Sequence, residues 1–159
     1  MAKGNAIILS NQPRGVFLEG PITGTPKPGT CMQIDISEGL DDTGRPTWEA
    51  YNADADGNQR LVAILLPDDF QGKIETDAYV AGDRGKVYIP VAGEEFNMLL
   101  ADVAGTGDDH VFGELLMIDD GTGKLIATTG SPESECFQLL EAVTDPTADQ
   151  LVHVIYTGY

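Results

Sequence analysis

Glycine and proline interrupt this chain at short intervals, and this punctuation limits what it can fold into. The 159 residues include 19 glycines and nine prolines, and these are spread along the sequence in short bursts rather than gathered in one linker. Between them lie short runs rich in β-branched and aromatic residues. Such runs suit strands joined by turns and leave no room for long amphipathic helices. The sequence therefore predicts an all-β fold, a small barrel or sandwich.

Apolar patterning places the expected strands. Residues 30–36 alternate between apolar and polar side chains, as in a half-buried strand. Asp119–Gly123 separates two apolar runs, and its Asp-Gly chemistry predicts a hairpin. The other predicted strands are 16–19, 47–52, 60–66, 86–91, 115–118, 124–128, 137–143 and 151–156.

Residues 94–104 fit two periodicities. Phe96, Leu99, Leu100 and Val103 recur at helical spacing, whereas Phe96, Met98 and Leu100 alternate as in a strand. Because the flanking segments are strand-like, we expect a strand here, with a short helical turn as the alternative.

The N-terminus differs from the rest of the chain. We expect residues 1–15 to form an extended arm and residues 16–159 to form a single domain, a size that one core can hold together. Ala6-Ile7-Ile8-Leu9 is apolar and β-prone, but Gly, Asn and Pro flank it. Such a segment can add a strand to an exposed sheet edge. The alternative is an ordinary first strand of the domain.

The charge of the chain restricts its partners. Twenty-six acidic residues against nine basic ones give a net charge of −17. Nucleic acids and anionic membranes attract basic proteins, so neither is expected as a partner. A partner should present a neutral or basic surface, unless the charge only maintains solubility. No apolar run is long enough to span a membrane, and two cysteines, Cys31 and Cys136, are expected to be buried and reduced.

The candidate metal and phosphate motifs all fail. Asn52–Gly57 fits the first half of a calcium loop, but the twelfth position, where a glutamate should bind, is Ala63. A plain turn is therefore favoured there. Gly121-Thr122-Gly123-Lys124 lacks the upstream glycine and the following Ser or Thr of a phosphate loop.

Catalytic patterns are equally weak. His110 and His153 have no Cys or His at ligand spacing, and Ser131 lacks the glycines of a nucleophile elbow. The sequence therefore predicts no catalytic, cofactor or metal site, and a protein that works by binding other proteins.

Several segments together resemble a known family. The arm up to Gly15, the Gly-Asp bend and Val-Tyr-Ile run within 79–91, the hairpin of 113–125 and the closing runs of 137–156 resemble the head decoration, or cement, proteins of tailed bacteriophages. The resemblance implies a β-tulip-type domain that sits as a homotrimer on the outer surface of an icosahedral capsid. It also implies the major capsid protein as partner, stabilisation of the shell as function, and synthesis in the host cytoplasm before assembly into the virion.

The resemblance also suggests which residues touch the capsid. Arms of this family add strands to sheet edges of the shell, so the candidate contacts are Ala6, Ile7, Ile8 and Leu9, with Arg14 as an exposed charge. On this interpretation, removal of residues 2–12 would spare the fold and weaken capsid binding.

Three other functions remain open from the sequence. The first is another phage structural role, in the tail or neck. The second is binding of a small ligand or carbohydrate on an aromatic platform of Trp48, Tyr51, Tyr79 and Tyr88, although core packing is the favoured use of these rings. The third is an enzyme whose site is assembled from distant acids.

Overall fold

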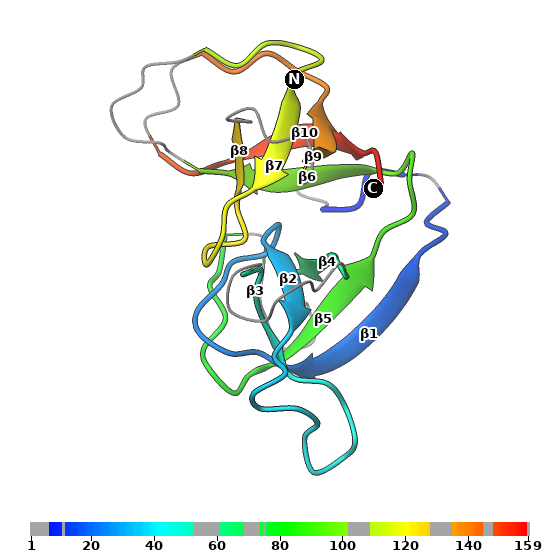
Figure 1. Ribbon diagram of the computed structural model, residues 1–159, viewed down its shortest axis with the longest axis vertical. Coiled ribbons are helices and arrows are strands. Elements are labelled where there is room, and N and C mark those ends of the chain that lie inside the picture. Colours follow the sequence, from blue (N-terminus) through cyan, green and yellow to red (C-terminus); the bar gives the residue numbers. More distant parts are fainter. Residues whose placement is uncertain are drawn as a thin grey trace.

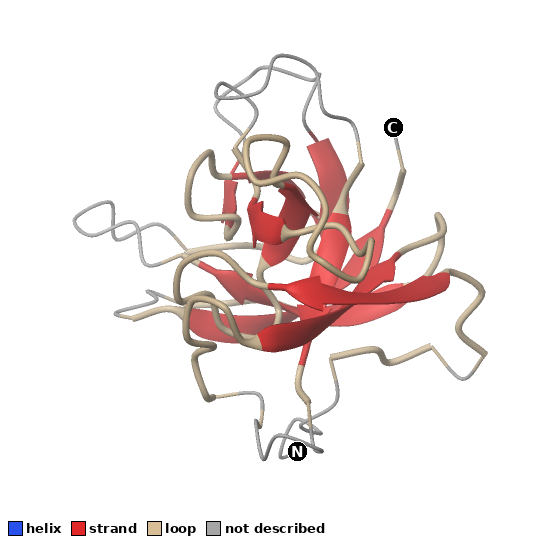
Figure 2. Cartoon of the chain, turned by 90° about the horizontal axis from the view of Figure 1, so that it is seen from below, coloured by secondary structure: helices blue, strands red, loops and turns tan. Residues whose placement is uncertain are grey.

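The described part of the chain contains strands and no helix. The computed structural model describes residues 7–10, 12–52, 61–68, 74, 76–101, 109–127, 135–144 and 148–158. These residues form two sheets, one above the other in Figure 1, and Figure 2 shows only strands and loops among them. The predicted all-β class is confirmed. No helix that could span a membrane occurs in the described residues.

The first sheet is antiparallel and curls around a small core of its own. Its strands are β1 (Val16–Pro21), β2 (Cys31–Ile34), β3 (Trp48–Ala50), β4 (Ala63–Leu66) and β5 (Arg84–Ile89), in the order β1-β5-β4-β2-β3. After β1 the chain bends to pair with the opposite edge, through a parallel bridge between Ile22 and Trp48. The side chains enclosed by this curl are Ile22, Met32, Trp48, Ala63, Leu65, Tyr79 and Val87.

The second sheet is a closed barrel. Its strands are β6 (Glu95–Leu100), β7 (Leu115–Ile118), β8 (Leu125–Ala127), β9 (Glu135–Leu139) and β10 (Gln150–Tyr156), in the closed order β10-β6-β8-β7-β9. All pairings are antiparallel except the short contact of Leu100 with Leu125.

The ambiguous segment of the sequence is strand β6, and its burial explains the ambiguity. From Phe96 to Leu100 every residue of β6 is buried, so apolar side chains occur on both faces. The adjacent pair Leu99 and Leu100 therefore imitates a helical spacing, although the backbone is extended. The strand expected over this segment is confirmed, and the helical alternative is wrong for residues 95–100.

The two sheets share one large core. This core joins Cys31, Ile64 and Tyr88 of the first sheet to residues of the barrel such as Phe96 and Phe137. Both cysteines are buried and free, as expected, and burial raises the pKa of both thiols.

The predicted hairpin between β7 and β8 forms and is hydrogen-bonded to the first sheet. Asp119 N–H donates to the Lys124 carbonyl at 2.8 Å, which closes the turn. Cys31 N–H then donates to the Gly123 carbonyl at 2.7 Å, and Gly121 N–H donates to the Tyr51 carbonyl at 2.8 Å. This hairpin therefore ties the barrel to strands β2 and β3.

A four-residue turn of one sequence pattern, Val-x-Gly-acid, precedes three strands. It occurs at Val80–Asp83 before β5, at Val91–Glu94 before β6 and at Val111–Glu114 before β7. In each turn the third residue is a glycine with φ of 88–90°, a conformation that side chains disfavour. The carboxylate of the fourth residue accepts the N–H of the valine, at 2.9, 2.8 and 3.1 Å respectively. The motif thus stiffens the entry to each strand.

Candidate functional site

The candidate arm residues lie on the protein's own barrel. Ile8 forms a bridge with Phe96 of β6, Leu9 N–H donates to the Glu95 carbonyl at 2.9 Å, and Asn97 N–H donates to the Ile7 carbonyl at 2.8 Å. Ile7 is only 2% exposed and belongs to the large core. Residues 7–9 therefore contact the barrel through an isolated bridge and two backbone hydrogen bonds, as the alternative of an ordinary first strand would place them. Ala6 lies outside the described residues.

The geometry of β6 explains why this segment pairs there. One edge of β6 is filled by β10 along its whole length. On the other edge, β8 reaches only Leu100, and Leu99 N–H donates to the carbonyl of Gly29 at 3.0 Å. The first half of that edge would be left without partners, and residues 7–9 occupy it. The chain thereby satisfies buried backbone groups that would otherwise be costly.

Arg14, which follows this segment in the chain, is hydrogen-bonded to the turn that precedes β6. Its N–H donates to Glu94 Oε1 at 2.5 Å, and its guanidinium donates to the Ala92 carbonyl at 3.1 Å. The next residue, Gly15, donates its N–H to the Tyr88 hydroxyl at 2.6 Å. Arg14 is exposed, so these contacts leave part of the side chain accessible.

Glu94 is the buried carboxylate at the centre of this arrangement. It is 2% exposed and accepts hydrogen bonds from the N–H groups of Arg14 and Val91 and from the Tyr88 hydroxyl. Burial by itself raises the pKa of Glu94, but these hydrogen bonds outweigh it, and the pKa lies below that of an ordinary glutamate. Glu94 was not among the residues predicted from the sequence, although the repeated Val-x-Gly-acid pattern is visible there.

Exchange of this carboxylate for an amide should destabilise the protein in a pH-dependent way. We expect Glu94→Gln to lower the free energy of unfolding by about 2 kcal/mol at pH 7, because charge-assisted hydrogen bonds to buried donors are lost. A lowered folded-state pKa stabilises the fold above the ordinary glutamate pKa, and this contribution disappears as the pH falls through the folded-state pKa. Urea unfolding at several pH values should therefore show the difference between parent and variant shrinking in acid.

A matched control separates this effect from the loss of one charge. Glu38 is exposed, so Glu38→Gln removes the same charge from the surface. We expect it to change the stability by less than about 0.5 kcal/mol. Equal effects of the two substitutions would show that Glu94 does not hold the N-terminal segment.

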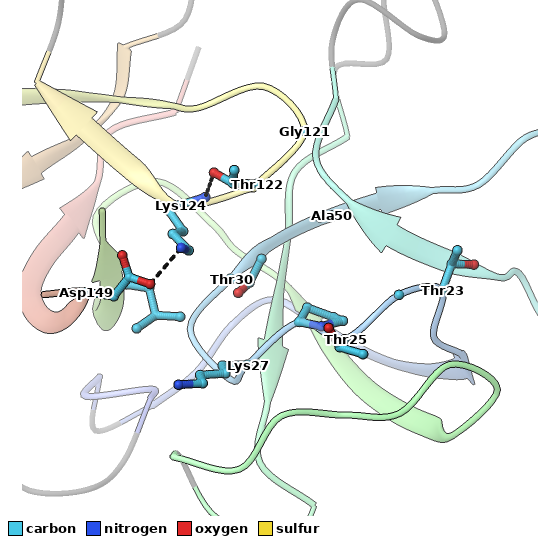
Figure 3. A pocket seen from close by; sticks show the side chains of 12 residues that line it. Thr23, Thr25, Lys27, Thr30, Ala50, Gly121, Thr122, Lys124 and Asp149 are labelled. Atoms are coloured by element: carbon cyan, nitrogen blue, oxygen red, sulfur yellow. Dashed lines mark hydrogen bonds and ion pairs between the residues drawn. The ribbon is translucent and has the colours of Figure 1, made fainter. Parts of the chain in front are cut away.

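A pocket of about 340 Å³ lies at the junction of the two sheets (Figure 3). The β1–β2 connection supplies one wall and the β7–β8 hairpin supplies another, and both walls are held by backbone hydrogen bonds. Lys124 pairs with Asp149 at 2.6 Å inside it. The lining residues are Thr23, Gly24, Thr25, Pro26, Lys27, Thr30, Ala50, Leu99, Gly121, Thr122, Lys124 and Asp149.

A wider groove of about 610 Å³ runs beside β1. Its lining includes the apolar side chains of Phe17 and Leu66 and the basic side chains of Arg45 and Lys86. Arg45 pairs with Glu19 at 3.1 Å, and Lys86 approaches Asp68 at 3.5 Å. The exposed Arg45–Glu19 pair adds little to stability, so Arg45 can exchange partners at low cost, whereas Asp68 of the second pair is buried.

The structure brings together no cluster of three or more metal-binding side chains among the residues it describes. The predicted turn that resembles a calcium loop, Asn52–Gly57, lies outside the described residues from position 53 onward, as does Ser131. The His110 ring contacts Glu114 at 3.2 Å and the His153 ring contacts Glu95 at 2.9 Å, while the His153 backbone N–H donates to Glu141 Oε1 at 2.7 Å.

The aromatic platform considered for carbohydrate binding does not exist. Trp48, Tyr79 and Tyr88 are fully buried, and Tyr51 is 8% exposed. The Tyr79 hydroxyl donates to the Leu66 carbonyl at 2.8 Å within the core. These rings pack the two cores, which is the use that the sequence favoured.

The fold has a counterpart among solved structures. The chain is similar to the structure described as "head fiber gp8.5 N base in bacteriophage phi29", with a TM-score of 0.53 and 12% sequence identity. The match covers 90% of this chain and 94% of the other. At this identity the likeness shows a shared fold. No protein-family model matches the chain, and no curated protein matches it either.

Proposed function

We propose that the protein is a structural component of a phage virion that binds the outer surface of an icosahedral capsid as a homotrimer and stabilises the shell. The observation that carries the proposal is the shared fold with the base of a phage head fibre over nearly the whole of both chains. The sequence resemblance to head decoration proteins also points to a phage structural protein, and it was drawn from the residues without use of the fold.

The surface of the protein is compatible with a binding role. The net charge of −17 favours a neutral or basic partner. Residues 7–9 remain candidate capsid contacts although they pair with β6. The backbone bonds to β6 involve the N–H of Leu9 and the carbonyl of Ile7, which lie on one edge of the segment. A strand of the shell would then pair along the outer side of Ile8, and Arg14 would contribute an exposed charge beside it.

Sedimentation with capsids tests the proposal directly. Purified protein mixed with undecorated shells of the same phage should pellet with them at a saturating ratio, and the decorated shells should resist heating better than bare ones. Sedimentation equilibrium of the free protein should give three times the chain mass. Protein that stays in the supernatant at every concentration would contradict capsid binding, and a protomer mass both free and on the shell would contradict the trimer.

A second candidate function, binding of a small ligand, is favoured by the preformed pocket between the sheets. Its polar lining includes two lysines and four threonines. A thermal-shift screen of sugars and small organic acids tests this function, which predicts a concentration-dependent rise in melting temperature.

A further inference from the structure

The turn before β7 carries the most exposed large apolar side chain in the described part of the protein. Phe112 is 69% exposed, its neighbour Val111 is 62% exposed, and Leu115 is 38% exposed. These three residues, here called the 111–115 tip, lie within five positions of one another. Large apolar groups gathered on a surface commonly mark contacts with other proteins.

The tip is held rigidly by hydrogen bonds on both sides. Glu114 Oε2 accepts from Val111 N–H, and Glu114 N–H donates to the Val111 carbonyl at 3.1 Å. Gly113 is fixed to β9, because its N–H donates to the Leu139 carbonyl and its carbonyl accepts from Gln138 Nε2. A turn whose backbone is already ordered loses little conformational entropy on binding, which favours its use as an anchor.

The other two Val-x-Gly-acid turns show that the fold does not require a phenylalanine at this position. Ala81 and Ala92 occupy the place of Phe112 in turns with the same hydrogen bonds and nearly the same glycine φ. The exposed phenylalanine ring at position 112 is therefore not needed to form the turn. A bound partner would explain it.

The charges around the tip indicate the chemistry of that partner. Asp109 and Glu114 lie on either side of Val111 and Phe112 in the sequence, and the whole chain carries −17. We propose that the 111–115 tip docks into an apolar pocket with a basic rim on the shell protein, with Phe112 as its anchor. This inference rests on the proposed function and adds the surface that makes the contact.

The substitution Phe112→Ala tests the anchor without endangering the fold, because it reproduces the Val-Ala-Gly-Glu sequence of the 91–94 turn. The matched control is Leu40→Ala, which shortens a side chain that is 67% exposed. Residues 37–45 form the cyan loop at the lower end of Figure 1, whereas residues 109–114 form the yellow-green loop at the upper end. Both variants should melt with the parent.

Sedimentation with undecorated shells gives the result. We expect Phe112→Ala to weaken shell binding at least tenfold and Leu40→Ala to change it less than twofold. Higher salt should weaken binding of the parent, because opposite charges at the rim are screened. Equal binding by Phe112→Ala and the parent, or equal losses in both variants, would overturn this inference and leave the proposed function standing. Failure of the parent to bind shells would overturn both.

Discussion

A Gly123→Ala variant should lose about 3 kcal/mol of the free energy of unfolding, because two costs coincide at this glycine. Its φ of +65° is left-handed, which costs an alanine about 1–2 kcal/mol. An added Cβ would also lie 2.2 Å from the Cys31 carbonyl oxygen and 2.7 Å from Thr30 Cγ2. The hairpin must then move away from β2, and the Cys31 N–H loses its bond to the Gly123 carbonyl. Urea unfolding measures the loss.

Gly121 in the same hairpin provides the control. Its φ is +82°, but no atom lies within 4 Å of the position where a Cβ would stand. Gly121→Ala should therefore show only the backbone cost, about 1 kcal/mol. If both variants lose the same amount, the hairpin does not seat tightly on the first sheet, and the two sheets are joined less closely than their shared core indicates.

The sequence predicted most strands because their signals are local. Alternation over 30–36 and the Asp-Gly turn between the runs 115–118 and 124–128 require only neighbouring residues, and the structure has strands or a hairpin in each place. Such patterns report which face of a strand is buried. They do not report which strand lies beside which.

The features that escaped prediction depend on contacts between distant segments. The place of Ile7 on β6 is decided by the short reach of β8, which leaves part of an edge open some 90 residues away in sequence. Glu94 is buried because Arg14 and Tyr88 converge on it, and no pattern around Glu94 contains those residues. Nonlocal pairing of this kind is also what brings the N-terminal segment into the domain.

That segment leads to the second large effect. Ile7→Ala should lower the free energy of unfolding by about 3 kcal/mol, because truncation of a buried isoleucine removes apolar contact and leaves a cavity. Deletion of residues 2–12 should cost at least as much, since it also removes the hydrogen bonds of Ile7 and Leu9 to β6. This expectation replaces the one drawn from the sequence, in which the deletion spared the fold.

Ile36→Ala is the matched control, since Ile36 is the same residue type at 58% exposure. It should change the stability by less than about 0.5 kcal/mol. Thermal and urea unfolding and shell binding should be measured on the parent, Ile7→Ala and Ile36→Ala. Together they show whether the N-terminal segment is part of the core or a free arm that binds the shell. A large loss for Ile7→Ala alone places residue 7 in the core, and any loss of shell binding then reflects the state of the domain. A neutral Ile7→Ala variant with weaker shell binding would instead return residues 6–9 to the role of a free arm, since a core residue cannot be shortened without cost.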